Sequence, residues 1–338
     1  QNMTQIPVKT FTIGVKSAQY NEAVVAREIA EILGTDHTEL YISEREAQAI
    51  IPQLSNYYSE PFADSSQIPT MLVSKLARQK VTVSLSGDGG DELFAGYKYY
   101  SFVNNVWEQV LQFPKPIREL GGWSARNIPI FNKSKLADKG KILGCKSPED
   151  LYNWDRTNKF DGRILRKDVM AYSKNDLCNK WIFDEYQQNI MLMDLQMYHP
   201  DDILVKVDRA AMAYSLETRI PMLDAKVIEF AWSLPFKYKK SNGVTKKVLR
   251  NVLYQYVPKE LMDRPKTGFS IPLDKWLKEK EMKEWGRSLL YDKNGILRED
   301  FFNIKRINKI YNNYYENGHW SEVIWRLLMY CEWRKERV

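Results

Sequence analysis

The alternation of strand-like and helix-like segments over the first hundred residues most constrains how this chain can fold. Alternating apolar, β-rich patterns at residues 8–15, 38–42 and 81–85 predict strands. Apolar positions at helical spacing predict helices between those strands, at residues 21–33 and 66–78. Strand–helix–strand units of this length predict a parallel sheet with right-handed crossovers, and therefore an α/β fold. Such sheets bind ligands at the carboxyl ends of their strands.

Residues beyond about 103 are typical of a helical structure. Strand patterns nearly vanish there, Trp, Tyr and Leu recur at helical spacing, and single prolines divide the segment. We therefore predict an α/β portion at residues 1–102 and a large helical portion at residues 103–338, packed together as one domain. With 338 residues, the chain is long enough to bury a substantial core.

Composition limits the compartment and the classes of partner. No run of about 20 apolar residues could span a membrane, and residues 1–15 lack a secretory pattern, so we expect a cytoplasmic protein without a membrane partner. Fifty Lys and Arg residues against 43 Asp and Glu residues give a net charge of +7, but the basic residues are scattered. We therefore expect no nucleic-acid partner. The short basic groups at residues 237–240 and 246–247 are interpreted as solvated surface.

The three cysteines, Cys145, Cys178 and Cys331, lie far apart in the sequence. Their spacing predicts neither a disulfide framework nor a paired metal or redox site. The three histidines are equally isolated, which argues against a zinc site. This use of cysteine fits a reducing compartment.

A glycine-rich acidic turn, Ser-Gly-Asp-Gly-Gly-Asp-Glu at residues 86–92, follows the third predicted strand. Its glycines let the backbone approach a ligand closely, and its N–H groups suit phosphate or ribose oxygens. Because carboxylates repel phosphate, we expect Mg²⁺ between the two. A purely structural turn or helix cap is the alternative. The turn lacks the patterns of a Walker loop and of a dinucleotide fold.

Two further charged segments extend the candidate site. Asp202 and Lys206 are spaced to share a helix face, and Glu217 and Arg219 follow them. Among apolar neighbours such charges need partners, and an internal ion-pair network that holds the helices together is an equally good interpretation. Lys266 lies in a loop bounded by Pro and Gly, where it could act as a point-charge ligand for phosphate.

Together these segments resemble the synthetase domain of glutamine-hydrolysing, class B asparagine synthetases. Residues 83–97 look like the second nucleotide-site motif of that family, residues 202–224 like its charged signature, and residues 264–276 like a third element. Residues 10–14 also match, so the resemblance spans essentially the whole chain. It implies a parallel-sheet nucleotide-binding layer, similar to the adenine nucleotide alpha hydrolases, with a large helical C-terminal portion.

The resemblance also implies an activity and its small-molecule partners. It implies ATP-dependent synthesis of asparagine from aspartate through a β-aspartyl-adenylate, with Mg²⁺ as cofactor and with ammonia that a glutaminase domain releases from glutamine. A homodimer is compatible with the family. In this reading, Ile13 and Gly14 border the adenosine, and Ser86 and Gly87 contact the nucleotide.

Three residues receive chemical roles from the same resemblance. Asp91 would hold Mg²⁺ on the pyrophosphate. Asp88 occupies the acidic position linked to adenylate formation, where some family members carry Glu. Lys266 would neutralise the charge that develops as the α-phosphate is attacked.

Two departures from the family pattern lead us to expect a fragment that is inactive by itself. Residue 1 is Gln1, where the family begins its glutaminase domain with cysteine, and the Ser-Gly-Gly-x-Asp-Ser pyrophosphate loop does not occur in the sequence. In the family, the strand before that loop lies between the strands that resemble residues 8–15 and 81–85. Without it, two inner sheet edges would lose their hydrogen-bonding partners.

Three alternatives to the asparagine synthetase reading stay open. A related amidotransferase of surface-polysaccharide synthesis would share every motif but modify another carboxylate. A β-lactam or peptide-cyclising synthetase would use an internal amine instead of ammonia. The third alternative is a chain that folds or associates without catalysing a reaction.

Overall fold

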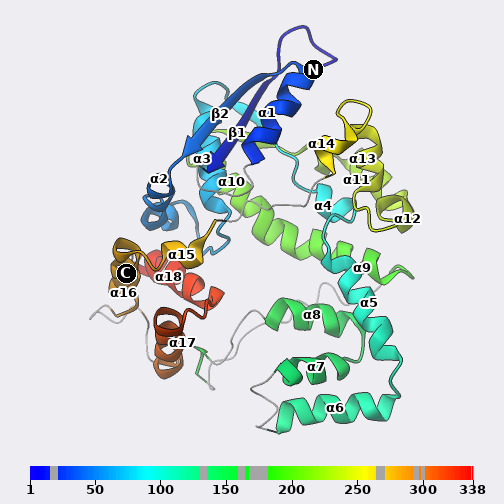
Figure 1. The fold of residues 1–338 in the computed structure, drawn as a ribbon, viewed down its shortest axis with the longest axis vertical. Coiled ribbons are helices and arrows are strands. Elements are labelled where there is room, and N and C mark those ends of the chain that lie inside the picture. Colours follow the sequence, from blue (N-terminus) through cyan, green and yellow to red (C-terminus); the bar gives the residue numbers. More distant parts are fainter. Residues whose placement is uncertain are drawn as a thin grey trace.

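The computed structural model describes residues 1–15, 22–128, 135–158, 164–166, 182–263, 271–291, 297, 301–335 and 337. The molecule is elongated, with the strands near the N-terminus at one end of its long axis and a group of helices at the other (Figure 1). The C-terminal helices lie along one side, next to the N-terminal portion.

The first strand pair agrees closely with the sequence prediction. β1 (Lys9–Val15) and β2 (Asp36–Ile42) are parallel neighbours, and α1 (Glu22–Leu33) connects them. Gly34 ends α1 with φ +66°, a conformation that glycine adopts without strain. The predicted parallel strand–helix–strand unit is therefore confirmed.

The second strand pair was predicted only in part. After α3 (Gln67–Arg78), β3 (Val83–Leu85) pairs in parallel with β4 (Glu217–Arg219). β4 lies beyond residue 103, where strand patterns nearly vanish, and it was not predicted because a three-residue strand with charged ends carries no apolar alternation. Within the described residues the two pairs are separate sheets rather than one continuous layer.

The rest of the described chain is mostly helical, as predicted, and the whole is an α/β structure with small parallel sheets. Its further helices are α2 (Glu44–Gln48), the 3₁₀-helix η1 (Ile51–Tyr57), α4 (Gly90–Leu93), α5 (Tyr99–Leu111), α6 (Lys115–Asn127), α7 (Lys135–Leu143), α8 (Pro148–Asn158), α9 (Tyr186–Met193), the π-helix η5 (Asp194–Leu204), α10 (Val205–Met212), the 3₁₀-helix η6 (Pro221–Leu223), α11 (Ala225–Ser233), α12 (Phe236–Lys239), α13 (Lys247–Leu253), α14 (Lys259–Met262), α15 (Leu273–Trp276), α16 (Lys280–Leu290), α17 (Ile304–Asn317) and α18 (Glu322–Lys335).

The largest apolar core joins the N-terminal strands to the C-terminal helices. Ile13 of β1 and Ile68 of α3 belong to the same buried cluster as Trp276 of α15 and Trp325 of α18. A second cluster, which includes Trp107 of α5, holds α5, α8 and α9 together. Burial of this apolar surface is the main favourable contribution to the fold. The main core is thus shared by the N-terminal strands and the C-terminal helices, and the division into an α/β portion at residues 1–102 and a helical portion at residues 103–338 stays a prediction.

Candidate active site

The glycine-rich turn follows β3 directly, and its conformation requires glycine. Ser86 N donates to Arg219 O at 2.9 Å, which extends the β3–β4 pairing into the turn. Gly89 has φ +83°, and an added Cβ would lie 2.9 Å from Leu223 Cδ2. Any side chain at this position would therefore be strained and crowded. Inside the turn, the Ser86 hydroxyl donates to the Asp88 carboxylate.

On one side of the turn the backbone is exposed to solvent. Gly87 is exposed, and an added Cβ there would meet no atom within 4 Å. Ser86 and Asp88 on either side are half-buried. The structure therefore brings Ser86, Gly87 and Asp88 together on one accessible turn at the carboxyl end of β3, which is where parallel sheets bind ligands.

Asp91 lies one residue into α4 and has a lysine partner. Its Oδ1 is 3.0 Å from Lys246 Nζ, and 23% of its side chain is exposed. Gly96 is required beside it, because an added Cβ would lie only 1.8 Å from the same carboxylate oxygen. Lys246 has φ +53°, and its N–H donates to Phe94 O at 3.1 Å. The expectation that residues 246–247 are simply solvated surface is therefore wrong for Lys246.

Glu92, the neighbour of Asp91, points into the interior instead. It is 1% exposed and accepts a hydrogen bond of 2.7 Å from the Tyr97 hydroxyl. His199 Nδ1 lies 3.6 Å from the same carboxylate. Burial raises the pKa of the Glu92 carboxyl, but the opposing effects of His199 and Tyr97 exceed it and hold that pKa below its usual value. Glu92 therefore stays ionised and ties the turn to η5.

A second buried carboxyl, Asp194, begins η5. It is fully buried and accepts hydrogen bonds from the hydroxyls of Tyr100 at 2.9 Å and Tyr152 at 2.5 Å. Burial, with a smaller contribution from the charge of Glu92, raises the pKa of Asp194 to about 8. Asp194 is therefore protonated near neutral pH, unlike Glu92.

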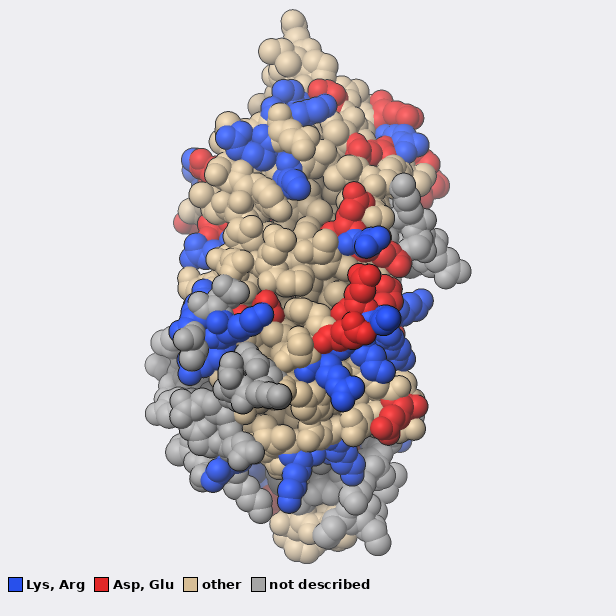
Figure 2. Space-filling view, turned by 90° about the vertical axis from the view of Figure 1, so that its left-hand side faces the viewer, with Lys and Arg blue, Asp and Glu red and all other residues tan. Residues whose placement is uncertain are grey.

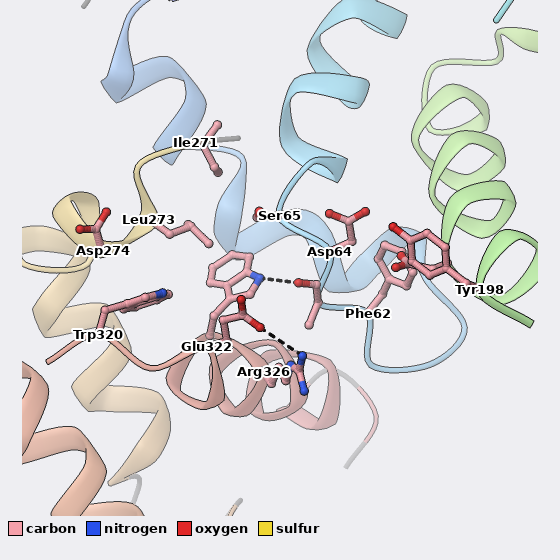
Figure 3. Close-up of a pocket in the computed structure, with 13 residues that line it drawn as sticks. Phe62, Asp64, Ser65, Tyr198, Ile271, Leu273, Asp274, Trp320, Glu322 and Arg326 are labelled. Atoms are coloured by element: carbon pink, nitrogen blue, oxygen red, sulfur yellow. Dashed lines mark hydrogen bonds and ion pairs between the residues drawn. The ribbon is translucent and has the colours of Figure 1, made fainter. Parts of the chain in front are cut away.

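The π-helix η5 connects this buried side to a pocket. π-helical segments are rare and occur frequently at functional sites. In η5, His199 contacts Glu92, whereas Tyr198 and Asp202 line a pocket of about 630 Å³. Figure 3 shows the pocket between η5, the loop before α3, residues 271–274 and α18.

The pocket wall combines carboxylates with aromatic rings. Asp64, Asp202, Asp274 and Glu322 supply the carboxylates, and Glu322 pairs with Arg326 at 3.3 Å. The aromatic lining residues are Phe62, Tyr198, Trp320 and Trp325. The pocket therefore offers both charged and aromatic contacts to a ligand.

Lys206, from α10, reaches the same region through Asp64. Its Nζ lies 3.1 Å from Asp64 Oδ2, and only 9% of the residue is exposed. The structure therefore brings Asp202 and Lys206 to one side of the fold, as their spacing suggested. Asp64 was missed in the sequence, although its loop at residues 60–66 is polar and precedes a helix.

Glu217 and Arg219 lie elsewhere, on β4. The Arg219 guanidinium donates to Glu217 Oε1 at 2.6 Å, and both side chains are more than half exposed. They pair with each other at the surface beside β3. Surface pairs of this kind contribute about 0–1 kcal/mol to stability.

Ile13 and Gly14 occupy the carboxyl-terminal half of β1. Both are buried, and they pair in register with Leu40 and Tyr41 of β2. Ile13 is part of the main core, so its side chain packs internally and any contact with a ligand would involve backbone or strand edge. Their role beside adenosine stays a prediction.

Lys266 lies outside the described residues. The last described residue before it is Asp263, which pairs with Arg250 at 2.8 Å. The first described residue after it, Ile271, lines the pocket. Ile271 is therefore the described residue after this gap that the structure places in the pocket wall.

The described residues contain no group of three or more His, Cys, Asp and Glu side chains that could hold a metal ion. Cys145 and Cys331 are buried free thiols, and Cys178 lies outside the described part of the chain. No helix in that part is long and apolar enough to cross a membrane.

The sequence model of the asparagine synthase family matches residues 1–335. This chain belongs to the asparagine synthase family. It is 29% identical over 345 residues to the glutamine-hydrolysing asparagine synthetase 1 of Bacillus subtilis strain 168, covering 98% of this chain and 52% of that protein. It is 33% identical over 285 residues to a putative glutamine-hydrolysing asparagine synthetase of Mycobacterium tuberculosis strain H37Rv, covering 82% of this chain and 43% of that protein.

A human relative is more distant. The chain is 25% identical over 275 residues to the glutamine-hydrolysing asparagine synthetase of Homo sapiens, covering 79% of this chain and 34% of the human protein. This asparagine synthase chain thus spans about half the length, or less, of the curated relatives that it matches. The resemblance inferred from its motifs is confirmed at the level of the family.

Proposed function

We propose that the protein carrying this chain activates the side-chain carboxylate of aspartate with ATP and converts it into the amide of asparagine. The family match over residues 1–335 is the observation that carries the proposal. Two features of the structure support it: an accessible glycine-rich turn at the end of β3, and a carboxylate-lined pocket on the other side of η5.

The chemistry explains why ATP is needed. A carboxylate is a poor acyl donor, because its leaving group would be an oxide. In the first step, a carboxylate oxygen of aspartate forms a bond to the α-phosphorus and the bond to pyrophosphate breaks, giving the β-aspartyl-adenylate. Ammonia derived from glutamine then attacks the acyl carbon, the bond to AMP breaks, and nitrogen loses a proton.

The turn is the proposed contact surface for the nucleotide. Ser86 and Gly87 would present a hydroxyl and a backbone N–H to it, and Ile13 and Gly14 would border the adenosine from β1. Asp88 is half-buried beside Ser86 and keeps its proposed part in adenylate formation. Lys246, at 3.0 Å from Asp91, adds a positive charge to this surface.

Asp91 is the proposed ligand for Mg²⁺. One carboxylate together with phosphate oxygens and water is an ordinary ligand set for this ion, so the residues present fit it. When bound, Mg²⁺ would offset the negative charge of the departing pyrophosphate. Lys266 would stabilise the charge that develops during attack on the α-phosphate. The place of Ile271 in the pocket wall supports this role.

The test is release of pyrophosphate from ATP that depends on aspartate, measured on the protein that carries this chain. We expect asparagine to form in equal amount when glutamine or ammonia is supplied. Absence of aspartate-dependent release from a folded protein that binds ATP would refute the proposal.

A second candidate differs only in the acceptor. At about 630 Å³ the pocket has room for a carboxylate larger than aspartate, which favours an amidotransferase of the surface-polysaccharide type as the alternative. Pyrophosphate release with a panel of carboxylates decides between the two. Activity with uronic-acid sugars but not with aspartate would replace the first proposal by the second.

A further inference from the structure

The helical hairpin α6–α7 lies at the end of the molecule farthest from the strands (Figure 1). Its two helices approach unusually closely, because glycines line their contact. An added Cβ at Gly144 would lie 2.5 Å from Gly122 Cα, and one at Gly140 would lie 2.6 Å from Ala125 Cβ. The hairpin is therefore a tightly packed unit with a defined outer face.

The outer face of α6 is apolar and exposed. Ile117, Leu120 and Trp123 follow one another at intervals of three residues and are 51%, 64% and 55% exposed. They form one stripe along the helix, directed away from the residues that contact α7. Leu111 and Phe113, just before α6, are about half exposed and continue the apolar surface.

The same hairpin concentrates the positive charge of the chain. In the sequence, residues 111–146 contain eight Lys and Arg residues against two acidic residues, a net charge of +6, whereas the whole chain has +7. The structure describes the side chains of five of these basic residues: Lys115, Arg118, Lys139, Lys141 and Lys146. The sequence expectation of scattered basic residues overlooked this, because single residues separate the charges along the chain. Figure 2 shows blue side chains next to an uncharged tip at the lower end of the molecule, where Figure 1 places the hairpin.

We propose that the α6–α7 hairpin binds the surface of an anionic lipid bilayer. A helix with an apolar stripe that includes Trp, flanked by Lys and Arg, lies in the headgroup region of a membrane with its apolar side inward. Each Lys or Arg near an anionic surface strengthens that binding. With 13 residues, α6 is too short to span the hydrocarbon core, so it lies on the surface.

The two features together favour lipid over other anionic partners. Nucleic acids would use the positive charges but leave Ile117 and Leu120 exposed, because aliphatic side chains neither stack on bases nor contact phosphate. An acidic protein would need a shaped apolar groove to cover the same stripe. The expectation of no membrane partner considered only spanning segments, and the present inference is independent of the proposed function.

Vesicle sedimentation of the protein that carries this chain tests the proposal. We expect binding to phosphatidylcholine vesicles that contain phosphatidylglycerol, loss of that binding at 1 M salt, and no binding to pure phosphatidylcholine. Replacing Lys115 and Lys139 by Gln removes two charges and should weaken binding roughly 25-fold. The double substitution Leu120→Ser and Trp123→Ser should weaken it at least about tenfold.

The matched controls replace the same kinds of side chain at exposed positions outside the hairpin. Lys237→Gln with Lys280→Gln removes two exposed charges, and Val24→Ser with Ile32→Ser changes two exposed apolar residues of α1. We expect both controls to bind vesicles as the unchanged protein does, with melting temperatures confirming that every variant is folded. Equal binding by the hairpin variants and the controls would overturn the proposal. The proposal would also be overturned if the folded protein did not bind anionic vesicles but bound RNA through these lysines.

Discussion

The two sides of the π-helix η5 differ in how their carboxyl groups are held. On the side of the glycine-rich turn, Glu92 and Asp194 are buried and contact Tyr97, Tyr100 and Tyr152. On the pocket side, Asp202 faces a space of about 630 Å³. Buried carboxyl groups hold the structure in place, whereas carboxylates that line a pocket can also be reached by a ligand.

This difference separates residues that are adjacent in sequence. Asp91 is partly exposed at the rim and paired with Lys246, while Glu92 is buried and paired with protein groups only. Substitutions at the rim or in the pocket should therefore change the reaction rate with little loss of stability. Substitutions on the buried side should lower the free energy of unfolding more than they lower the reaction rate.

The largest expected effect is that of Asp91→Asn. In the protein that carries this chain, it should lower aspartate-dependent pyrophosphate release by on the order of 10²- to 10³-fold, the scale of losing one electrostatic contact to the transition state. The melting temperature should stay nearly constant. Glu39→Gln, which removes a carboxylate paired with Arg27 far from the turn, is the control. A normal rate at ordinary Mg²⁺ would contradict the metal role.

Lys266→Ala should act almost as strongly, but on one kinetic constant. We expect kcat for adenylation to fall by about 10²-fold, with a much smaller rise in KM for ATP, because the charge is needed mainly in the transition state. Lys259→Ala, on α14 before the same loop, should leave both constants unchanged. A change in KM alone would make Lys266 a residue of ground-state binding.

Asp194→Asn tests the buried side through pH. Burial raises the pKa of Asp194 to about 8, so the folded protein keeps a proton that the unfolded chain loses above about pH 4. The contribution of this group to stability is fully present at low pH and is lost as pH rises toward 8. Between pH 6 and 7 the unchanged protein should lose up to about 1.4 kcal/mol relative to the Asn variant.

Denaturant unfolding at both pH values measures this difference. Asp138→Asn replaces a carboxylate that is 49% exposed and is the matched control, for which we expect no such difference. Parallel pH profiles for the unchanged protein and the Asp194→Asn variant would show that Asp194 is ionised throughout.

The smallest effect is expected for Arg219→Ala. Because Arg219 and Glu217 form an exposed pair, its loss should lower the free energy of unfolding by less than about 1 kcal/mol. Lys206→Met, which leaves Asp64 without its lysine partner in a nearly buried place, should cost about 1–3 kcal/mol. A marked fall in pyrophosphate release with Arg219→Ala, in a protein of unchanged stability, would place the surface pair in the active site.

The sequence predicted the elements that rest on local patterns. Apolar periodicity predicted strands at residues 8–15 and 38–42 and a helix at residues 66–78, which correspond to β1, β2 and α3. In the structure, Ser43 also opens α2 with a capping box to Glu46. β4 escaped prediction because three residues are too few to show a period. Its pairing depends on β3, more than 130 residues away in sequence.

The part of the candidate site that lies within one sequence motif could be predicted. The part that the fold brings together from distant segments could not. Residues 86–89 form the turn and residues 90–93 the short helix α4 that follows it. The contacts Lys246–Asp91, His199–Glu92 and Lys206–Asp64 join segments that no local pattern relates. Asp64 and His199 looked like ordinary polar residues, because their partners become neighbours only in the folded chain.

The π-helix η5 makes the spacing of these groups sensitive to chain length. Each of its backbone rings contains one residue more than the corresponding ring of an α-helix. Over Asp194–Leu204 this wider repeat directs His199 toward the turn and Asp202 toward the pocket. Loss of a single residue would let the segment relax into an α-helix and rotate one of these side chains out of its position. Substitutions should therefore be tolerated in this segment more readily than deletions, even deletions of residues that touch no ligand.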